Sequence, residues 1–249
     1  MMKATLLKYL FVTLALLPAA MPLPAAEPPH WLAERARSSD LVVLAQLERV
    51  DYEYERNFPV SGEAWFRPLI WYKAVSRPPG FLIVREKGLH DHACYFDDGL
   101  DFAEPPRYLL FLVYDEQTES WRGHPDGCAA QILVGSDLSY VARWPQPFFG
   151  GEHGRGDETL QALVETMDFQ GPGSRIDAGD LLEHQRRVRA ERDFMIVEGT
   201  FLRPTRGIRL SRLRELMAPG LTQSDDEGDR KSRLEELKAR VLEQAGDSG

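Results

Sequence analysis

The stretch that decides the fold is Tyr108–Tyr114, which reads YLLFLVY and follows the pair Pro105-Pro106. It combines apolar, aromatic and β-branched residues over the usual length of a strand, and the two prolines mark where it begins. A second run, LVVLAQL at Leu41–Leu47, comes directly after Asp40 and has the same character. Both runs therefore predict β-strands.

Shorter strand-like segments lie on either side of these two runs, and Ser61-Gly62 reads as a turn before the first of them. Short strands at roughly regular spacing from Ser38 to about Trp144 predict a small barrel or sandwich. Pro68 favours an edge or a bulge in its strand. Most of the aromatic residues in that strand are expected in the core, although alternation turns some outward. The segments are Ala64–Val75, Phe81–Val84, Trp121-Arg122 and Gln131–Val134, and the aromatic residues are Trp65, Phe66, Trp71 and Tyr72.

Helical patterns frame this β-rich part. One helix is predicted over Pro29–Arg37, before the first strand. After the Gly-rich connection at Phe148–Asp157, the region 157–249 is expected to be helical, with a polar linker near 222–228. Asp157 is a suitable N-cap for its first helix. The predicted helices span Asp157 to about Phe169, Asp177–Asp193, Leu210–Met217 and Asp229–Gln244, while Phe194–Leu202 is ambiguous between strand and helix.

The N-terminal segment predicts export. Lys3 and Lys8 precede the apolar run Tyr9–Leu17, and small residues and prolines follow up to Ala25. These are the parts of a secretory signal peptide, expected to be residues 1–25, and the apolar run is short for a bilayer span. The alternative is an uncleaved anchor helix. We expect a periplasmic or secreted protein without a stable membrane span after cleavage, whose folded part begins with a domain over 26–147.

The chain has two cysteines, Cys94 and Cys128. In an oxidising compartment the default expectation is one disulfide between them. Histidines precede both cysteines, however, so a Cys/His zinc site is an alternative. His90 and His92 would share one face of a strand, and together with His124 they form a histidine-only metal site as a further hypothesis. The acids Asp97, Asp98, Asp101 and Glu104 offer oxygen ligands for calcium.

Taken as a set, the pattern resembles the netrin-like family of OB barrels, which includes the tissue inhibitors of metalloproteinases and exported bacterial domains. The residues that carry the resemblance are SSDLVVLAQLERV, the aromatic strand ending in Tyr72-Lys73, CYFDDG, RYLLFLVY and the final DGC, covering about residues 38–145. The resemblance implies a five-stranded Greek-key barrel with a disulfide that ties strand ends. We therefore expect a mainly β fold of the α+β type, with an OB-like barrel followed by a helical C-terminal region.

The inhibitory mechanism of the metalloproteinase inhibitors does not carry over to this chain. Those proteins chelate the catalytic zinc through an N-terminal cysteine. Here the expected mature start is Ala26 or Glu27, and the nearest cysteine is Cys94. The resemblance therefore supports an exported interaction domain and leaves a protease inhibitor unsupported.

Charge is unevenly distributed along the sequence. The chain of 249 residues carries a net charge of −9, which makes nucleic acid an unsuitable partner. Arginines are nevertheless concentrated between Arg186 and Arg214. Guanidinium groups favour bidentate contacts with carboxylates and phosphates, so this stretch is a candidate docking surface for an unknown protein or an anionic envelope partner. The alternative is that these arginines pair with the chain's own acids. The docking candidates are Arg186, Arg187, Arg189, Arg192, Arg206, Arg209 and Arg212.

Catalytic signatures are absent from the sequence: it contains no G-x-S-x-G, H-E-x-x-H, Walker loop or G-x-G-x-x-G. We predict no catalytic residue and no cofactor. Three functional hypotheses follow. The first is an exported non-enzymatic protein that acts by protein–protein contact through the barrel and the Arg-rich region. The second is a periplasmic metal-binding protein that uses the three histidines named above, and the third is an unrecognised envelope hydrolase.

Overall fold

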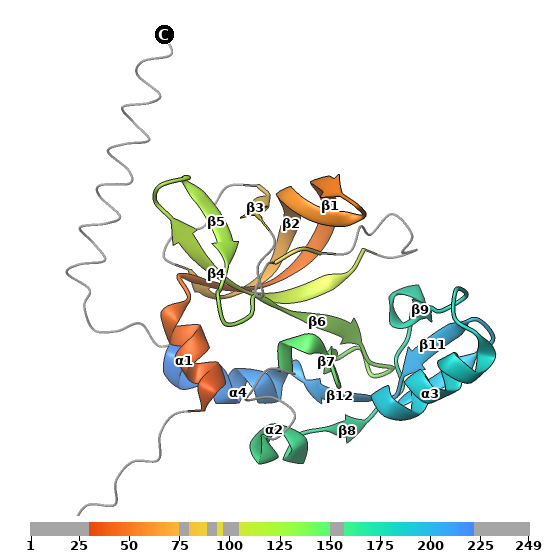
Figure 1. The fold of residues 1–249 in the computed structure, drawn as a ribbon. Coiled ribbons are helices and arrows are strands. Elements are labelled where there is room, and N and C mark those ends of the chain that lie inside the picture. Colours follow the sequence, from red (N-terminus) through yellow and green to blue (C-terminus); the bar gives the residue numbers. More distant parts are fainter. Residues whose placement is uncertain (1–29, 75–79, 89–93, 97–104, 150–156, 222–249) are drawn as a thin grey trace, which may run out of the picture.

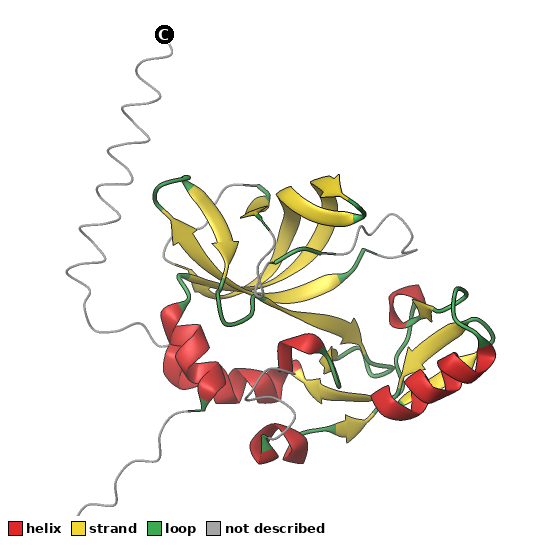
Figure 2. Cartoon of the chain, viewed as in Figure 1, coloured by secondary structure: helices red, strands yellow, loops and turns green. Residues whose placement is uncertain are grey.

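The computed structural model describes residues 30–74, 80–88, 94–96, 105–149 and 157–221, which are mainly β with four short helices (Figures 1 and 2). Five strands close into a barrel in the order β1-β2-β3-β5-β4, and β4 returns to pair with β1. The β3–β5 contact is parallel and the other contacts are antiparallel. The predicted OB-like barrel followed by a region with helices is therefore confirmed. The barrel strands are β1 (Leu41–Glu55), β2 (Phe58–Ala74), β3 (Leu82–Lys87), β4 (Arg107–Asp115) and β5 (Ser120–Gly123).

The first half of β1, Leu41–Leu47, and the middle of β4, Leu109–Leu112, are buried on both faces. Because side chains alternate along a strand, one set of their residues lines the barrel interior and the other set faces away from the barrel. The outward set forms a second core with the helices. The inward residues are Leu41, Val43, Ala45, Leu47, Leu110 and Leu112, and the outward residues are Val42, Leu44, Leu109 and Phe111. This two-sided burial explains why both segments read as continuous apolar runs.

The β1–β2 hairpin turns at Arg56-Asn57, where both residues have positive φ angles, 49° and 69°. Two consecutive left-handed residues suit the twist of a two-residue hairpin turn. The predicted turn at Ser61-Gly62 is wrong, because both residues lie inside β2. Gly62 has a φ of 133°, and a side chain there would overlap the carbonyl oxygen of Asp51. Glycine is therefore required at position 62 because β1 and β2 lie close together there, and not because the chain reverses direction.

A bulge follows Pro68, as its place in the sequence predicts. Leu44 pairs with Ile70 while Ala45 pairs with Pro68, so Leu69 has no partner in the ladder. Proline donates no backbone hydrogen bond, and a bulge at this point accommodates that loss.

Strand β4 is paired along its other edge by two successive strands, β5 and then β6 (Ala129–Val134). The five residues between them, which we call the 124–128 loop, leave the ladder and return at the same position. Phe111 N–H donates to the carbonyl of Cys128, and Phe111 C=O accepts from the N–H of His124. The loop is thus an excursion anchored at both ends on one residue of β4.

The sheet extends beyond the barrel through β6, and the strands that follow are β7 (Tyr140–Arg143), β12 (Arg206–Arg209) and β8 (Glu165–Thr166). A separate three-stranded sheet has the order β10-β11-β9, and helix α3 (Glu183–Asp193) packs on it through Ala190 and Leu202. Its strands are β9 (Ile176–Asp177), β10 (Met195–Glu198) and β11 (Phe201–Pro204). The described ranges also contain the 3-10 turns η2 (Pro147–Phe149) and η3 (Pro172–Ser174).

This C-terminal part contains more β-structure than the sequence predicts. The helix expected from Asp157 to about Phe169 is only α2, Glu158–Ala162, and the next one begins at Glu183 instead of Asp177. The ambiguous segment Phe194–Leu202 lies in the β10–β11 hairpin region. Strands of two to four residues carry too little local pattern to be recognised, because their stability comes from partners far away in the chain. Residues 1–25, the linker near 222–228 and the helix expected at 229–244 lie outside the described residues.

Helices α1 (Trp31–Ser38) and α4 (Leu210–Leu221) bring the two ends of the described chain together below the barrel (Figure 1). Their apolar faces join the second core through Leu32 and Met217, both fully buried. Gly220 lies so close to α1 that an added Cβ would overlap the carbonyl oxygen of Ala33. No helix in the described ranges is long and apolar enough to cross a membrane.

We predict that Gly220→Ala destabilises the protein by about 1–3 kcal/mol, because the new methyl group separates α1 from α4. The change alone would favour a helix by up to about 1 kcal/mol, so a net loss identifies the helix contact as its cause. Urea unfolding measures the effect. Ser211→Ala, on the exposed side of α4, is the control, and equal stability of the two variants would contradict the prediction.

Cys94 and Cys128 form the predicted disulfide, with their Cα atoms 6.0 Å apart and a sequence separation of 34. It fixes the end of the 124–128 loop to the segment 94–96. Gly123 makes room for it, since a Cβ at Gly123 would lie 2.5 Å from the Cβ of Cys94 and 2.8 Å from that of Cys128. Disulfide bonding removes both thiolates that the Cys/His zinc hypothesis requires.

We expect native protein to show no reactive thiol in a titration without reductant. Cross-linking a loop of this length constrains the unfolded chain, and the Cys94→Ala/Cys128→Ala variant should lose about 3–4 kcal/mol of unfolding free energy. Wild-type protein unfolded in reductant should show the same loss. Two free thiols in the oxidised native protein would refute the pairing.

Candidate functional site

The outer surface of strands β1, β2 and β3 carries a partly exposed aromatic cluster with an arginine over it. Trp65 alternates with the buried residues Ala64 and Phe66 and therefore points away from the barrel interior. Cross-strand pairing places Arg49 on one side of it and Ile83 on the other. We call this surface the Trp65 face and define it by Arg49, Trp65, Phe81 and Ile83.

The contacts within the Trp65 face are specific. The Arg49 guanidinium carbon lies 4.1 Å from the centroid of the Trp65 ring, a cation–π distance. Phe81 meets the same ring edge-on at 6.2 Å and is 49% exposed. The indole Nε1 of Trp65 is buried and has no hydrogen-bond acceptor among the described residues. Two ion pairs border the face, Glu48–Arg67 at 2.9 Å and Glu63–Arg85 at 2.7 Å.

The other predicted aromatic residues of β2 belong to the cores. Phe66 is fully buried in the barrel. Trp71 packs partly buried against the barrel core, and Tyr72 packs against the second core. Burial raises the pKa of Tyr72, while the nearby Arg214 opposes that shift. Trp65 is thus the one residue of the four whose ring faces outward in a cluster with a cation.

The predicted Arg-rich docking surface is divided among three elements. Arg186, Arg187, Arg189 and Arg192 lie on or near α3, Arg206 and Arg209 on β12, and Arg212 on α4. Figure 1 shows α3 and α4 at opposite ends of β12. The sequence cluster is therefore spread over the length of the C-terminal part.

Most of these arginines contact groups of the same chain. Arg187 pairs with Glu183 at 2.5 Å, Arg192 with Asp193 at 2.7 Å and Arg212 with Glu215 at 3.0 Å. Such exposed pairs contribute little free energy, so they leave the arginines available to a partner.

Four other arginines of the stretch contact groups from more distant parts of the chain or backbone carbonyls. Arg186 donates to the carbonyl oxygens of Ala178 and Leu181. Arg209 bridges Asp137 and Glu165. Hydrogen bonds from Ser139, together with the one from Arg209, hold the pKa of Asp137 well below its usual range. Arg206 lies 3.9 Å from the ring of Phe194. Arg203 bridges Glu198 and Asp168.

His124, one of the predicted metal ligands, is 4% exposed and bonded at both ring nitrogens. Its Nε2 lies 2.8 Å from Ser38 Oγ, its Nδ1 lies 3.2 Å from the backbone N of Asp126, and the Asp126 carboxylate is 3.9 Å away. The chain of contacts from Ser38 through His124 to Asp126 resembles the Ser–His–Asp catalytic triad of hydrolases. His90 and His92 lie outside the described residues, as do the predicted calcium ligands 97–104. Within the described ranges no three His, Cys, Asp or Glu residues form a metal-binding group.

The hydrogen bonds assign the tautomer of His124. Since Nδ1 accepts the N–H of Asp126, the proton of the neutral ring is on Nε2 and is donated to Ser38 Oγ. Ser38 in turn donates to the carbonyl oxygen of Glu34 at 2.8 Å. A catalytic triad needs the opposite arrangement, with Nε2 free to take the serine proton and Nδ1–H donating to the carboxylate. The cluster therefore holds α1 against the 124–128 loop and offers no general base to Ser38.

Burial lowers the pKa of His124; the Asp126 carboxylate opposes this shift and the Arg35 guanidinium adds to it. A histidine whose pKa is lower in the folded than in the unfolded protein takes up protons on unfolding. The contribution of His124 to stability is therefore complete at a pH above the pKa of histidine in the unfolded chain, about 6.5. This contribution is lost as the pH falls below that pKa.

We predict that the urea midpoint falls between pH 7.5 and pH 5.5, and that His124→Gln reduces this fall. Glutamine keeps a donor for Ser38 but does not titrate in this range. His184→Gln, on the exposed surface of α3, is the control and should retain the wild-type pH dependence. An unchanged dependence in His124→Gln would show that this imidazole is not responsible.

Asp157 is confirmed as the N-cap of α2, and it also joins α2 to α1. One carboxylate oxygen accepts the N–H groups of Thr159 and Leu160. The other contacts His30 Nε2 and accepts Trp31 Nε1–H, both at 2.7 Å. Burial works against the charged form, but these hydrogen bonds outweigh it and lower the pKa of Asp157. Its role is structural.

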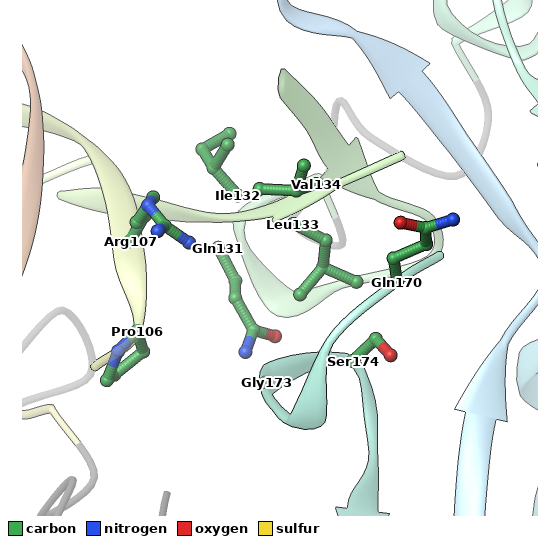
Figure 3. A pocket seen from close by; sticks show the side chains of 9 residues that line it. All are labelled: Pro106, Arg107, Gln131, Ile132, Leu133, Val134, Gln170, Gly173 and Ser174. Carbon is green, nitrogen blue, oxygen red and sulfur yellow. The ribbon is translucent and has the colours of Figure 1, made fainter. Parts of the chain in front are cut away.

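A pocket between β4, β6 and η3 has a volume of about 20 Å³, room for a single water molecule (Figure 3). It is lined by Gln131 from β6 and by Gly173 and Ser174 from η3. This is far below the volume of a small-molecule site. Among the described residues, the Trp65 face is the more suitable candidate for binding.

Comparison with protein-family models, with curated proteins and with solved structures finds no match to this chain. The netrin-like resemblance therefore stays a prediction from the sequence. The residues that sequence reasoning missed are Arg49 and Phe81, whose contacts with Trp65 depend on strand register, and Ser38, whose contact with His124 spans 86 residues.

Proposed function

We propose that this chain is an exported protein, periplasmic or secreted, that acts by binding another protein and catalyses no reaction. The barrel is its binding domain, the Trp65 face is the main contact surface, and the exposed arginines of α3 form a second one. Export is supported by the signal-peptide pattern of residues 1–25 and by the disulfide. The netrin-like resemblance supports an interaction domain.

The observation that carries the proposal is the composition of the Trp65 face. Tryptophan and arginine are the residues most enriched where protein–protein binding energy is concentrated. Here they contact each other at 4.1 Å on a rigid sheet, with the half-exposed ring of Phe81 beside them. A sheet surface holds these side chains in place, so little conformational entropy is lost on binding.

The chemistry of the face indicates the kind of partner. Trp65, Phe81 and Ile83 offer apolar contact, and Arg49 has no carboxylate partner among the described residues. The surrounding arginines, Arg67 and Arg85, already pair with Glu48 and Glu63. The face therefore suits a protein that presents an apolar side chain next to a carboxylate.

The test is site-specific photo-crosslinking of the full-length protein in its exporting host, with the crosslinker at Arg67, followed by binding assays with the purified partner. We expect Trp65→Ala to weaken binding by at least tenfold, as for a central contact residue, and Arg49→Glu to weaken it further through charge repulsion. Leu138→Ala, which changes an apolar side chain that is 78% exposed elsewhere on the protein, should bind like wild type.

A partner that binds wild type and Trp65→Ala equally would contradict the assignment to this face. Absence of a crosslinked partner, or retention of the protein in the cytoplasm with residues 1–25 uncleaved, would contradict the proposed function itself. Simultaneous Arg187→Glu, Arg189→Glu and Arg192→Glu changes test the contribution of α3 in the same assay.

A further inference from the structure

Arg35, in the middle of α1, is a buried cation with an unmet hydrogen-bonding requirement. Only 9% of its surface is exposed. Its Nη1 is fully buried and has no hydrogen-bond partner in the described parts of the chain. Buried guanidinium groups are ordinarily paired with an acceptor or an anion, since desolvation of an unpaired charge costs several kcal/mol. The missing partner requires an explanation.

The guanidinium of Arg35 lies against two aromatic rings. Its guanidinium carbon lies 4.5 Å from the ring centroid of Trp31 and 4.8 Å from that of Phe148. The two rings are 5.9 Å apart and tilted by 50°, so they form a corner and leave the rest of the guanidinium uncovered by aromatic rings. Phe148 in turn stacks on Phe111 of β4 at 5.3 Å.

The 124–128 loop borders the remaining side. A Cβ at Gly127 would lie 3.2 Å from Nη1, so glycine at this position keeps a side chain away from the guanidinium. The charge of the Asp126 carboxylate acts on Arg35, but the Asp126 side chain is 75% exposed and forms no ion pair with Arg35 among the described residues. Burial lowers the pKa of Arg35 to about 10, and Asp126 opposes the shift only in part. The internal acid thus compensates the charge incompletely.

We propose that Arg35 is the anchor of a binding site for a carboxylate, at the junction of α1, the 124–128 loop and η2. The ligand is a carboxylate with an apolar body: its two oxygens accept from the guanidinium, and its apolar part lies against Trp31 and Phe148. A phosphate is less suitable, because a single guanidinium beside the negative charge of Asp126 provides too few donors for a strongly hydrated dianion. His124 does not contribute, since both of its nitrogens are already bonded.

Two substitutions separate this site from a purely structural arginine. Arg35→Met keeps the length and the aromatic contacts but removes the charge. If the arginine lacks its partner in the free protein, this variant should be at least as stable as wild type. Asp126→Asn removes the carboxylate that competes with the ligand and should strengthen ligand binding several-fold.

The experiment measures thermal unfolding of the full-length protein and binding by calorimetry, with sodium propionate as the probe and sodium chloride at equal ionic strength as the control. We expect propionate to raise the unfolding temperature of wild type saturably, to bind Asp126→Asn more tightly, and to have no such effect on Arg35→Met. Glu34→Gln, on the exposed surface of the same helix, should behave like wild type.

Two peptides identify the source of the carboxylate, one with a free C-terminus and one amidated but otherwise identical. Tighter binding of the free form than of propionate indicates a polypeptide C-terminus, and binding of propionate alone indicates a small organic acid. A propionate effect that persists in Arg35→Met, or no difference between propionate and chloride in either wild type or Asp126→Asn, would overturn the proposal. Because none of these variants touches the Trp65 face, the outcome is independent of the proposed function.

Discussion

The two-sided burial of β1 and β4 is the constraint on which the rest of the structure depends. Side chains that alternate along these two strands belong to two different cores. Each buried leucine or valine contributes about 1.5–3 kcal/mol, so neither face can be left in water. The barrel satisfies the inward face by closing on itself. The outward face needs a separate cover, and α1, α4 and the strands after β6 supply it. The C-terminal part is therefore an integral element of the fold and not an appendage to the barrel.

The same constraint explains which features were predictable from sequence. Leu41–Leu47 and Tyr108–Tyr114 were recognisable because a strand buried on both faces is apolar at every position, a signal that needs no knowledge of the partner. The N-cap at Asp157 was recognisable for a similar local reason. Strands β8 and β12 were not, because two to four residues carry no periodicity, and β7 stabilises β12 only after the chain has crossed more than 60 residues. The hairpin turn at Arg56-Asn57 was missed because arginine is an unusual residue for a left-handed position.

The candidate sites show the same limit of sequence reasoning. The Arg-rich stretch stood out because a sequence reveals how many charges are close together along the chain. It does not reveal that Arg209 would bridge Asp137 and Glu165, or that α3 and α4 would lie at opposite ends of β12. Trp65 was among the expected aromatic residues, but its separation from Phe66 and Trp71 depends on strand alternation and on register with Arg49. His124 was predicted as a metal ligand, and its observed contact with a serine 86 residues away could not be read from the sequence.

Arg35 stands out because a buried nitrogen of its side chain lacks a hydrogen-bond partner among the described residues. The number of charges near it in the sequence does not distinguish it. It belongs to no basic cluster, and the ion-paired arginines of α3 make far more conspicuous contacts. An exposed ion pair contributes little to the free energy of unfolding. An unpaired buried guanidinium, in contrast, carries the full cost of desolvation. A carboxylate at Arg35 would lower that cost and contact α1, the 124–128 loop and Phe148 together. Phe148 stacks on Phe111 of β4, α1 packs in the same core, and the loop is bonded to the backbone of Phe111, so ligand binding there would strengthen the junction between the barrel and its cover.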